Sequence, residues 1–399
     1  MEEIRYWIWL SQLNISPKAR ASVLQDFGNP ETAFHSAEGS FRRRKGISNQ
    51  EVELLEARSL DGTDDILARC EDQELVLLPF TADEYPQKLR ETAVPPAILF
   101  VKGSLPALDE LPVISVIGTR RASPYGIKMG ERLAYEIARC GGTVVSLLSP
   151  GVDEAAARGA LRAGKACIGV LGTSHEQCHY SIAQEILRYG ALISEYPPGR
   201  DSSRHFFRER NRVAAGISDG VVVVEAPEKS GTRLFVNDAV DQGKDIFAIP
   251  GNADAENAVG TLALLKEGAK LVTTGAEVME EYLLRYPEGI VLEPEEETAA
   301  SSESREENPE TKAQKDGASE SEAASAEQVF RAQLSQLTED QLKIVAAIDP
   351  GSTYVDDITE RTGLSTARVL AQLTVLEIKG IVRREAGRRF ALNLTIVEK

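Results

Sequence analysis

The sequence predicts an α/β protein built on a doubly wound parallel sheet, with a small helical domain before it and a compact module after it. Short β-branched runs at 113–117 and 220–225 have the continuous apolar character of strands that are buried on both faces. Between 113 and 272 such runs alternate with helical stretches. Repeated strand–helix alternation is typical of a parallel sheet that helices cover on both faces.

Residues 1–75 are expected to form the helical domain. Trp7, Leu10 and Leu13 recur at helical spacing, and Ser16-Pro17 is a typical helix start. The basic run at 42–45 could contact a nucleic-acid backbone, although a solvated helix end is the more common meaning of such a run.

The main domain is predicted to span 76–286. A short strand is expected at 74–78, and the proline-rich segment that ends at 98–103 reads as an extended arm joining the sheet, because each proline resists helix. The alternation then predicts strands at 113–117, 143–145, 166–171, 192–193, 221–225, 245–249 and 270–272. It predicts helices at 125–140, 153–163, 181–189, 211–215, 234–242 and 260–267.

Residues 287–330 are predicted to be an acidic, disordered linker. Between 287 and 327 there are 13 acidic and 3 basic residues, which contribute −10 to the net charge of −17. Such a segment cannot bury enough apolar surface to offset its chain entropy. The remaining chain is only mildly acidic, so local arginine clusters can still attract phosphate groups.

Residues 331–399 are predicted to form three short helices followed by a basic hairpin at 381–392, which together describe a winged helix. Such modules usually bind duplex DNA through the third helix. Here that helix carries few bases, Arg368 and Lys379, and its leucines look like core residues. A protein-binding or dimerisation role therefore stays as open as DNA binding.

Several function classes have no support in the sequence. The 399 residues contain no apolar run of about 18 residues, and the acidic N-terminus does not resemble a signal region, so we expect a soluble, cytoplasmic protein without a membrane partner. The four cysteines lack paired spacing, and the segment 175–179 matches no zinc pattern. With no phosphate-loop motif or catalytic triad, we expect no metal, no cofactor and no enzymatic activity.

Candidate phosphate contacts lie where two strands end. Gly118 and Arg120 follow the strand at 113–117, and Ser230 and Gly231 follow the strand at 220–225. Ligands of such sheets bind beyond the carboxyl ends of the strands, where glycines let backbone amides approach an anion. The alternatives are a surface ion pair at Arg120 and an ordinary tight turn at Ser230.

The segment 204–212 supplies further candidates. Its arginines suit a phosphate backbone, and an aromatic ring can stack on an unpaired base. We expect Phe207 to stack and Phe206 to be a core residue; the alternative for the arginines is neutralisation by Glu209 and Glu225. The candidates from this segment are Arg204, Phe207, Arg210, Asn211 and Arg212.

These motifs, in their order and spacing over nearly the whole chain, resemble the DNA-processing protein A family (DprA, also called Smf). The motifs are Gly118-Thr-Arg120, Ser194-Glu-Tyr-Pro197, Phe207-x-x-Arg-Asn-Arg212, Val224-Glu-Ala226 before Ser230-Gly231, and Pro250-Gly251.

The resemblance implies an extended Rossmann-like fold, a helical N-terminal domain of the SAM or helix-hairpin-helix type, and a winged helix. It also implies homodimerisation, single-stranded DNA binding and delivery of that strand to the recombinase RecA in natural transformation. The residues implied to bind single-stranded DNA are Gly118, Arg120, Arg204, Phe207, Arg210, Asn211, Arg212, Ser230 and Gly231.

Four places depart from the family pattern. Leu147 replaces a usual glycine, Ala157 a common histidine and Leu262 a usual asparagine, and larger residues occupy the turn at 233–236. These departures leave two other hypotheses open. One is a nucleotide-binding or nucleotide-processing site, in which Asp153, Glu195 and Glu225 would act on a ribose or as acid–base groups. The other is a divergent member that acts mainly through protein partners.

Overall fold

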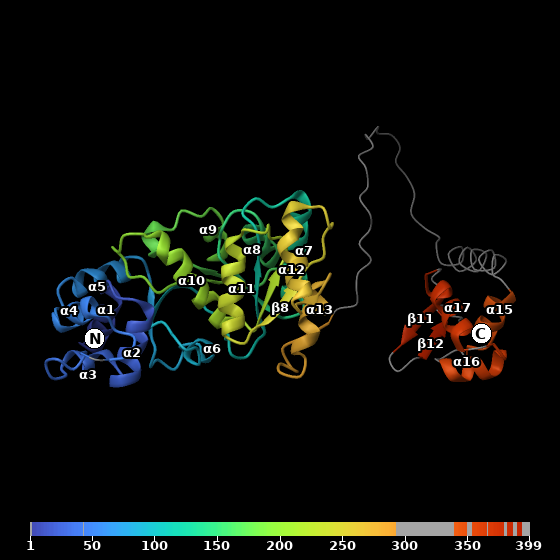
Figure 1. Cartoon of the computed structure of the whole chain (residues 1–399), viewed down its shortest axis with the longest axis horizontal. Coiled ribbons are helices and arrows are strands. Elements are labelled where there is room, and N and C mark those ends of the chain that lie inside the picture. Colours follow the sequence, from blue (N-terminus) through green and yellow to red (C-terminus); the bar gives the residue numbers. More distant parts are fainter. Residues whose placement is uncertain are drawn as a thin grey trace, which may run out of the picture. The chain divides into compact units, whose positions relative to one another are not determined.

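The computed structural model describes residues 2–42, 44–292, 339–348, 353–364, 366–378, 381–385 and 389–392. The chain divides into two compact units, 1–298 and 299–399 (Figure 1). The first contains the N-terminal helices and a nine-stranded sheet, and the second contains a three-stranded sheet with helices. The predicted α/β class with a small C-terminal module of helices and a hairpin is therefore confirmed, while the bounds of the four predicted domains stay a prediction.

Five helices form the beginning of the first unit: α1 (Glu2–Gln12), α2 (Pro17–Phe27), α3 (Pro30–Phe34), α4 (Asn49–Glu56) and α5 (Thr63–Asp72). Local sequence sets their starts, because Ser16 and Asn29 cap helices that have proline in the first turn, and Ser48 makes a capping box with Glu51. Trp7 and Leu10 lie in the core of these helices, as the spacing predicted.

The basic run at 42–45 includes one paired arginine. The Arg44 guanidinium lies 3.0 Å from the Asp26 carboxylate and 4.9 Å from the centroid of the Phe27 ring. Arg44 therefore belongs to the packing of the helical domain, while Arg43 lies outside the described residues.

The large sheet has the strand order β1-β2-β6-β5-β4-β3-β7-β8-β9. The strands are β1 (Val76–Pro79), β2 (Ile98–Gly103), β3 (Val113–Ile117), β4 (Thr143–Ser146), β5 (Cys167–Val170), β6 (Ala191–Ser194), β7 (Gly220–Val223), β8 (Asp245–Ala248) and β9 (Lys270–Leu271). The chain runs outward from β3 to β6 and then returns to β7 on the other side of β3. Such a reversal of strand order defines a doubly wound sheet, so this part of the predicted fold is confirmed.

Strands β3 to β9 are parallel, whereas β2 pairs antiparallel with both β1 and β6. The predicted parallel sheet is therefore confirmed for most of its strands, and only β2 runs against the others. No helix connects β2 to β3 along the chain, and mixed sheets of this kind are common. The predicted arm at 98–103 does join the sheet, as β2.

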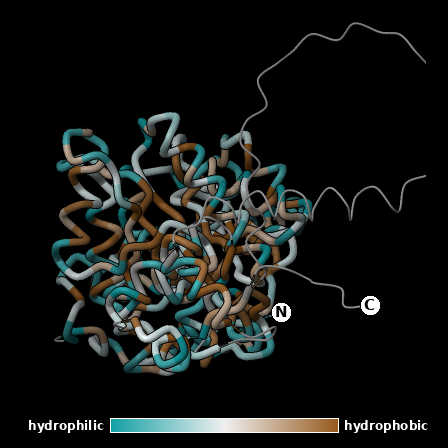
Figure 2. The backbone as a smooth tube through the Cα atoms, turned by 90° about the vertical axis from the view of Figure 1, so that its right-hand side faces the viewer, coloured by the Kyte–Doolittle hydropathy of each residue, from teal (hydrophilic) through white to brown (hydrophobic). Residues whose placement is uncertain are grey.

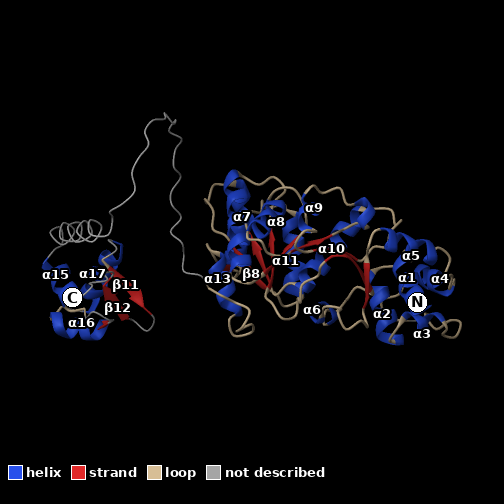
Figure 3. Ribbon diagram, turned by 180° about the vertical axis from the view of Figure 1, so that it is seen from behind, coloured by secondary structure: helices blue, strands red, loops and turns tan. Residues whose placement is uncertain are grey.

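Helices cover both faces of this sheet (Figure 3). Ile114 and Val116 of β3 pack in one core cluster, and Val113 and Ile117 pack in the other, because successive strand residues point to opposite faces. Hydrophobic stretches alternate with hydrophilic ones along the backbone (Figure 2). The first cluster contains residues of α7 (Pro124–Arg139), α8 (Val152–Arg162), α9 (Ile182–Ile186) and α13 (Gly275–Met279); the second contains residues of α6 (Gln87–Arg90), α10 (Arg204–Ile217), α11 (Gly231–Asp241) and α12 (Val259–Lys266).

Two helix starts differ from the sequence prediction. Helix α10 begins at Arg204 rather than 211, because Ser203 caps it before any apolar periodicity is visible. Helix α11 begins at Gly231 rather than 234, because the Ser230 side chain accepts a hydrogen bond from Thr232 N. Both corrections bring predicted site residues into the first turn of a helix.

The chain is still packed where the linker was predicted to begin. Ile290 is buried in the core of the sheet domain, and Val291 N donates to the Cys140 carbonyl at 3.1 Å. The rest of the predicted linker, from 293 onward, lies outside the described residues.

The second unit contains α15 (Glu339–Ala346), β10 (Thr353–Tyr354), α16 (Val355–Thr362), α17 (Thr366–Ile378), β11 (Val382–Glu385) and β12 (Arg389–Leu392). Leu373 and Leu376 of α17 are buried in its core, as predicted. Arg368 of that helix donates to the Asp340 carboxylate at 2.7 Å, and Lys379 lies outside the described residues. Among the helices described, none is long and apolar enough to span a membrane.

Candidate functional site

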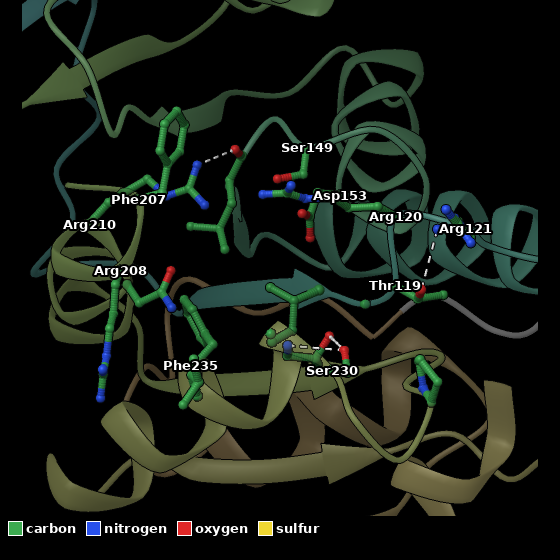
Figure 4. Close-up of a pocket in the computed structure, with 18 of the residues that line it drawn as sticks. Thr119, Arg120, Arg121, Ser149, Asp153, Phe207, Arg208, Arg210, Ser230 and Phe235 are labelled. Atoms are coloured by element: carbon green, nitrogen blue, oxygen red, sulfur yellow. Dashed lines mark hydrogen bonds between the residues drawn. The ribbon is translucent and has the colours of Figure 1, made fainter. Parts of the chain in front are cut away.

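A cavity of about 500 Å³ opens beyond the carboxyl ends of β3, β4 and β7 (Figure 4). It lies at the point where the chain reverses direction between β3 and β7, which is where ligands bind in doubly wound sheets. Four segments line it: the loop after β3, the loop from β4 into α8, the first half of α10, and the turn that starts α11.

The lining of this cavity is strongly cationic. Of the residues that line it, six are cationic and only Asp153 is acidic. The N-termini of α8, α10 and α11 also lie at the cavity, and helix N-termini carry partial positive charge and free N–H groups. The combination favours an anion with several acceptor oxygens. The cations are Arg120, Arg121, Arg204, Arg208, Arg210 and Lys229.

The structure brings together eight of the nine residues predicted from the sequence. They are Gly118, Arg120, Arg204, Phe207, Arg210, Asn211, Ser230 and Gly231. The ninth, Arg212, does not line the cavity. Its guanidinium pairs with the Glu195 carboxylate and donates to the Val94 carbonyl at 2.6 Å.

The partners of the two arginines explain why Arg210 and Arg212 separate. Arg212 is held by the Glu195 carboxylate and the Val94 carbonyl, whereas Arg210 is held by the Leu147 carbonyl in the floor of the cavity. Arg212 is therefore not brought to the cavity with the other eight predicted residues.

Arg210 lies in the floor of the cavity, with only 3% of its surface exposed. Its Nη1 donates to the Leu147 carbonyl at 2.8 Å, and it also contacts the Tyr180 hydroxyl and the charge of Asp153. Burial lowers the pKa of Arg210 while Asp153 raises it. Arg210 is thus fixed by its neighbours, whereas the other five cations are exposed.

The carboxylates that were considered as neutralising partners bind elsewhere. Glu209 accepts a hydrogen bond from the Tyr196 hydroxyl at 2.8 Å and pairs with His205 at 3.0 Å. Glu225 accepts a hydrogen bond from the Ser123 amide at 2.9 Å and is not among the residues that line the cavity. That alternative interpretation is wrong, and the groups that face Arg210 and Arg212 are Asp153 and Glu195.

Asp153 is the acidic member of the site, in the first turn of α8. Burial raises the pKa of its carboxyl to about 7, against the opposing effects of Arg210, the Gly118 amide, the Ser149 hydroxyl and Arg120. Its Oδ1 atom has no hydrogen-bond partner among the described residues. The sequence raised Asp153 only as a possible acid–base group.

The two predicted glycines differ in their surroundings. A Cβ on Gly118 would lie 2.6 Å from the Val152 side chain and 2.8 Å from the Glu225 carbonyl, so only glycine allows this close passage. A Cβ on Gly231 would meet nothing within 4 Å. The first turn of α11 is therefore open to a ligand at Gly231.

The two phenylalanines have separate surroundings, although Phe206 is half-buried rather than the predicted core residue. Phe207 is half-buried and lines the cavity, with the Arg210 guanidinium 5.6 Å from its ring centroid. Phe206 instead stacks on Tyr196 at 4.2 Å between centroids and lies below the Arg200 guanidinium. Only Phe207 is placed to meet a ligand in the cavity.

Three cationic residues of the cavity were missed by sequence reasoning: Arg121, Arg208 and Lys229. Arg208 follows Arg204 by four positions, which places both on one helix face, but this was hidden while α10 was expected to begin at 211. Arg121 and Lys229 each adjoin a predicted residue. The described residues contain no cluster of three or more side chains suited to a metal ion.

A doubly wound sheet that gathers cations and helix N-termini at its reversal point defines an anion-binding Rossmann-like protein. The model of the DNA recombination-mediator protein A family matches residues 76–283, and that of the DprA winged helix domain matches residues 328–388. The chain belongs to this family, which confirms the resemblance seen in its motifs.

Individual relatives agree with this assignment. The chain is 32% identical over 220 residues to DNA processing protein DprA of Bacillus subtilis (strain 168), covering 54% of this chain and 74% of the relative. It is 27% identical over 402 residues to protein Smf of Synechocystis sp., covering 97% and 98%. The X-ray structure of DNA processing protein A from Streptococcus pneumoniae superimposes with a TM-score of 0.60 at 30% identity, covering 69% of this chain and 97% of that one.

Proposed function

We propose that the cavity binds single-stranded DNA and that the protein processes DNA through this binding. The observation that carries the proposal is the clustering of five exposed cations, three helix N-termini and the Phe207 ring around one cavity. Proteins that bind single strands with little sequence preference combine a cationic path for the backbone with aromatic rings for unpaired bases. The names of the relatives, DNA processing proteins, support the same function.

The shape of the site favours an unpaired strand over a duplex. In a single strand a base can turn away from its neighbours and enter a cavity, whereas a paired base cannot without being flipped out. A volume of about 500 Å³ lies in the range of small-ligand sites and can accommodate one nucleotide. Phosphates on either side of that nucleotide would meet Arg120, Arg121 and Lys229 on one rim and Arg204 and Arg208 on the other.

The finer parts of the proposal rest on the family resemblance. In this view the protein acts in the cytoplasm as a homodimer, binds rather than cleaves the strand, and delivers it to the recombinase RecA during natural transformation.

A second candidate function is recognition of a free nucleotide in the same cavity. The observation that favours it is Asp153, a buried carboxyl that can exchange a proton near neutral pH beside an anion site. A nucleotide site of this kind would accept a mononucleotide as readily as a strand.

Fluorescence anisotropy of a labelled oligothymidylate, titrated with the full chain at several salt concentrations beside a matched duplex, tests the proposal. We expect saturable binding that prefers the single strand and weakens with salt by a slope of about −0.7 per phosphate contact. Unlabelled mononucleotides that displace the strand at low concentration would favour the second candidate. Binding to neither strand nor duplex would reject the proposed function.

A further inference from the structure

The acidic residue of the cavity needs an explanation, because a carboxylate opposes the binding of a polyanion. Asp153 is the single acid among the cavity-lining residues, and only 4% of its surface is exposed. A buried, ionised carboxyl is costly unless it is paired and hydrogen-bonded. The contacts of Asp153 therefore decide whether its buried carboxyl can stay ionised.

Those contacts satisfy the carboxyl only in part. Asp153 lies beside Ser149 and Arg120 at the cavity (Figure 4), and the Gly118 amide, the Ser149 hydroxyl and the guanidiniums of Arg210 and Arg120 lower the pKa of its carboxyl. Its Oδ1 remains without a partner among the described residues. The carboxyl therefore depends on the charge of these two arginines to stay ionised.

The two arginines near Asp153 differ in how strongly other groups hold their side chains in place. Arg210 is buried and held by the Leu147 carbonyl and the Tyr180 hydroxyl, so it stays beside the carboxyl. Arg120 is exposed and faces the cavity, where a bound phosphate would pair with it. A phosphate paired with Arg120 would reduce the stabilisation that this arginine gives to the Asp153 carboxylate. It would also place a second anion close to that carboxylate.

We propose that Asp153 is a positioning residue for Arg210 and that it takes up one proton when a nucleic-acid phosphate binds in this cavity. This inference rests on the proposed function. In the empty cavity the carboxylate orients the Arg210 guanidinium; in the filled cavity the proton removes the repulsion between the carboxylate and the phosphate. The burial that raises the pKa of Asp153 to about 7 makes such a proton available near neutral pH.

The sign of the pH dependence follows. A bound phosphate raises the pKa of Asp153 further, so between the pKa values of the empty and the filled site the complex holds more protons than the free protein. Affinity for the strand therefore falls as pH rises above about 7, by at most roughly tenfold per pH unit for one proton. Below the pKa of the empty site, Asp153 is already protonated and contributes no slope.

Other ionisable groups near the site can be separated from Asp153. On its own helix, Glu154 pairs with Arg158 at 2.8 Å at the surface. On α10, His205 adjoins Arg204, and histidine is the other side chain that commonly changes charge in this pH range. The variant His205→Gln is therefore the matched control for Asp153→Asn.

Titration calorimetry of the full chain with oligothymidylate at pH 7.5, in two buffers of different ionisation enthalpy, counts the protons taken up. We expect roughly half to three quarters of a proton per site for the parent and for His205→Gln, and about none for Asp153→Asn. Between pH 7 and 8 the parent should lose roughly three- to fivefold in affinity, and Asp153→Asn much less.

Each outcome decides the inference. Strand binding by the parent without proton uptake overturns it while leaving the proposed function intact, and so does proton uptake that persists in a folded Asp153→Asn. Absence of strand binding at every pH rejects the proposed function and this inference together. If Asp153→Asn does not fold, an isotope-edited infrared titration of aspartate carboxyls in the parent, with and without the strand, takes its place. A buried carboxyl band that does not move with the strand then overturns the inference.

Discussion

The Nη1 atom of Arg210 donates a hydrogen bond to the carbonyl of Leu147 at 2.8 Å, which ties α10 to the loop after β4. Leu147 is a position where the family usually has glycine. Because the bond uses a backbone carbonyl, which every residue supplies, the leucine leaves the anchor of the arginine in place. Its side chain instead forms part of the cavity wall. The departure therefore changes the shape of the site rather than the position of its buried cation.

Replacing Arg210 with methionine is expected to lower the free energy of unfolding by about 3 kcal/mol at pH 8, because it leaves a buried carboxylate and a buried carbonyl without their partner. The loss should be smaller at pH 6, where Asp153, with a pKa of about 7, is mostly neutral. Urea unfolding at both pH values measures the effect. The exposed Arg208→Met, on the same helix, is the control. Equal stability of Arg210→Met and the parent at pH 8 would show that the charge of Arg210 does not stabilise the Asp153 carboxylate.

Replacing Arg120 with glutamine is expected to weaken binding of an oligothymidylate and to reduce the slope of log affinity against log salt by about 0.7, the contribution of one phosphate contact. Anisotropy titrations at several salt concentrations measure the slope. Arg162→Gln, at the exposed far end of α8, is the matched control and should keep the parent slope. An unchanged slope in Arg120→Gln would remove this residue from the site.

Replacing Arg212 with glutamine should have the opposite pattern. Its guanidinium pairs with the buried Glu195, so the loss should appear in stability, by about 3 kcal/mol, and not in the salt slope of strand binding. Urea unfolding and the same anisotropy titrations separate the two effects. A reduced salt slope with unchanged stability would mean that Arg212 turns toward the strand after all.

Replacing Phe207 with alanine is expected to weaken strand binding by about 1–3 kcal/mol, the usual contribution of one aromatic–base stack. Phe206→Ala should instead reduce stability, because this ring stacks on Tyr196 outside the cavity. Anisotropy and urea unfolding on both variants measure the pair. If the two variants bind equally well, the cavity wall at Phe207 does not contact a base.

Buried His175 should make stability fall in mild acid. Its Nε2 lies 2.9 Å from the Phe100 carbonyl, and burial lowers its pKa from 6.5 to about 4. Between these values the unfolded chain binds a proton that the folded protein excludes. The free energy of unfolding therefore declines by about 1.4 kcal/mol per pH unit from this residue, or roughly 3 kcal/mol in all. Urea unfolding of the parent and His175→Gln from pH 7 to 4 tests this, and parallel curves would show that His175 is not the cause.

Much of the fold could be predicted because apolar runs and helical periodicity are local properties. The strands at 113–117, 143–145 and 245–249 were predicted to within a residue or two. Strand direction is not local: the run at 98–103 signals a buried strand, but its antiparallel pairing with β6 depends on the path of the chain between them. The start of α10 was missed because its first turns are charged.

The site was predictable where a residue type and a strand end were enough, as for Gly118 and Arg120. It was not predictable where the outcome depends on a partner brought in by folding. Nothing in the segment 204–212 reveals that Arg212 pairs with Glu195 and that the charge of Asp153 acts on Arg210, since Glu195 follows β6 and Asp153 lies in the first turn of α8. The fold, and not the segment itself, decides which of the two arginines reaches the cavity.

The pairing of β3 with β7 has a consequence for the order of events during protein synthesis. The Val113 amide bonds to the Asp219 carboxylate across 106 residues of sequence. A ribosome adds about 5–20 residues per second, so several seconds pass between the synthesis of β3 and the synthesis of Asp219 and β7. Until then its apolar edge is unpaired and open to β-rich neighbours or chaperones. The cavity is completed later still, after Ser230 has left the exit tunnel, so a nascent chain stalled before that point lacks one wall of the cavity.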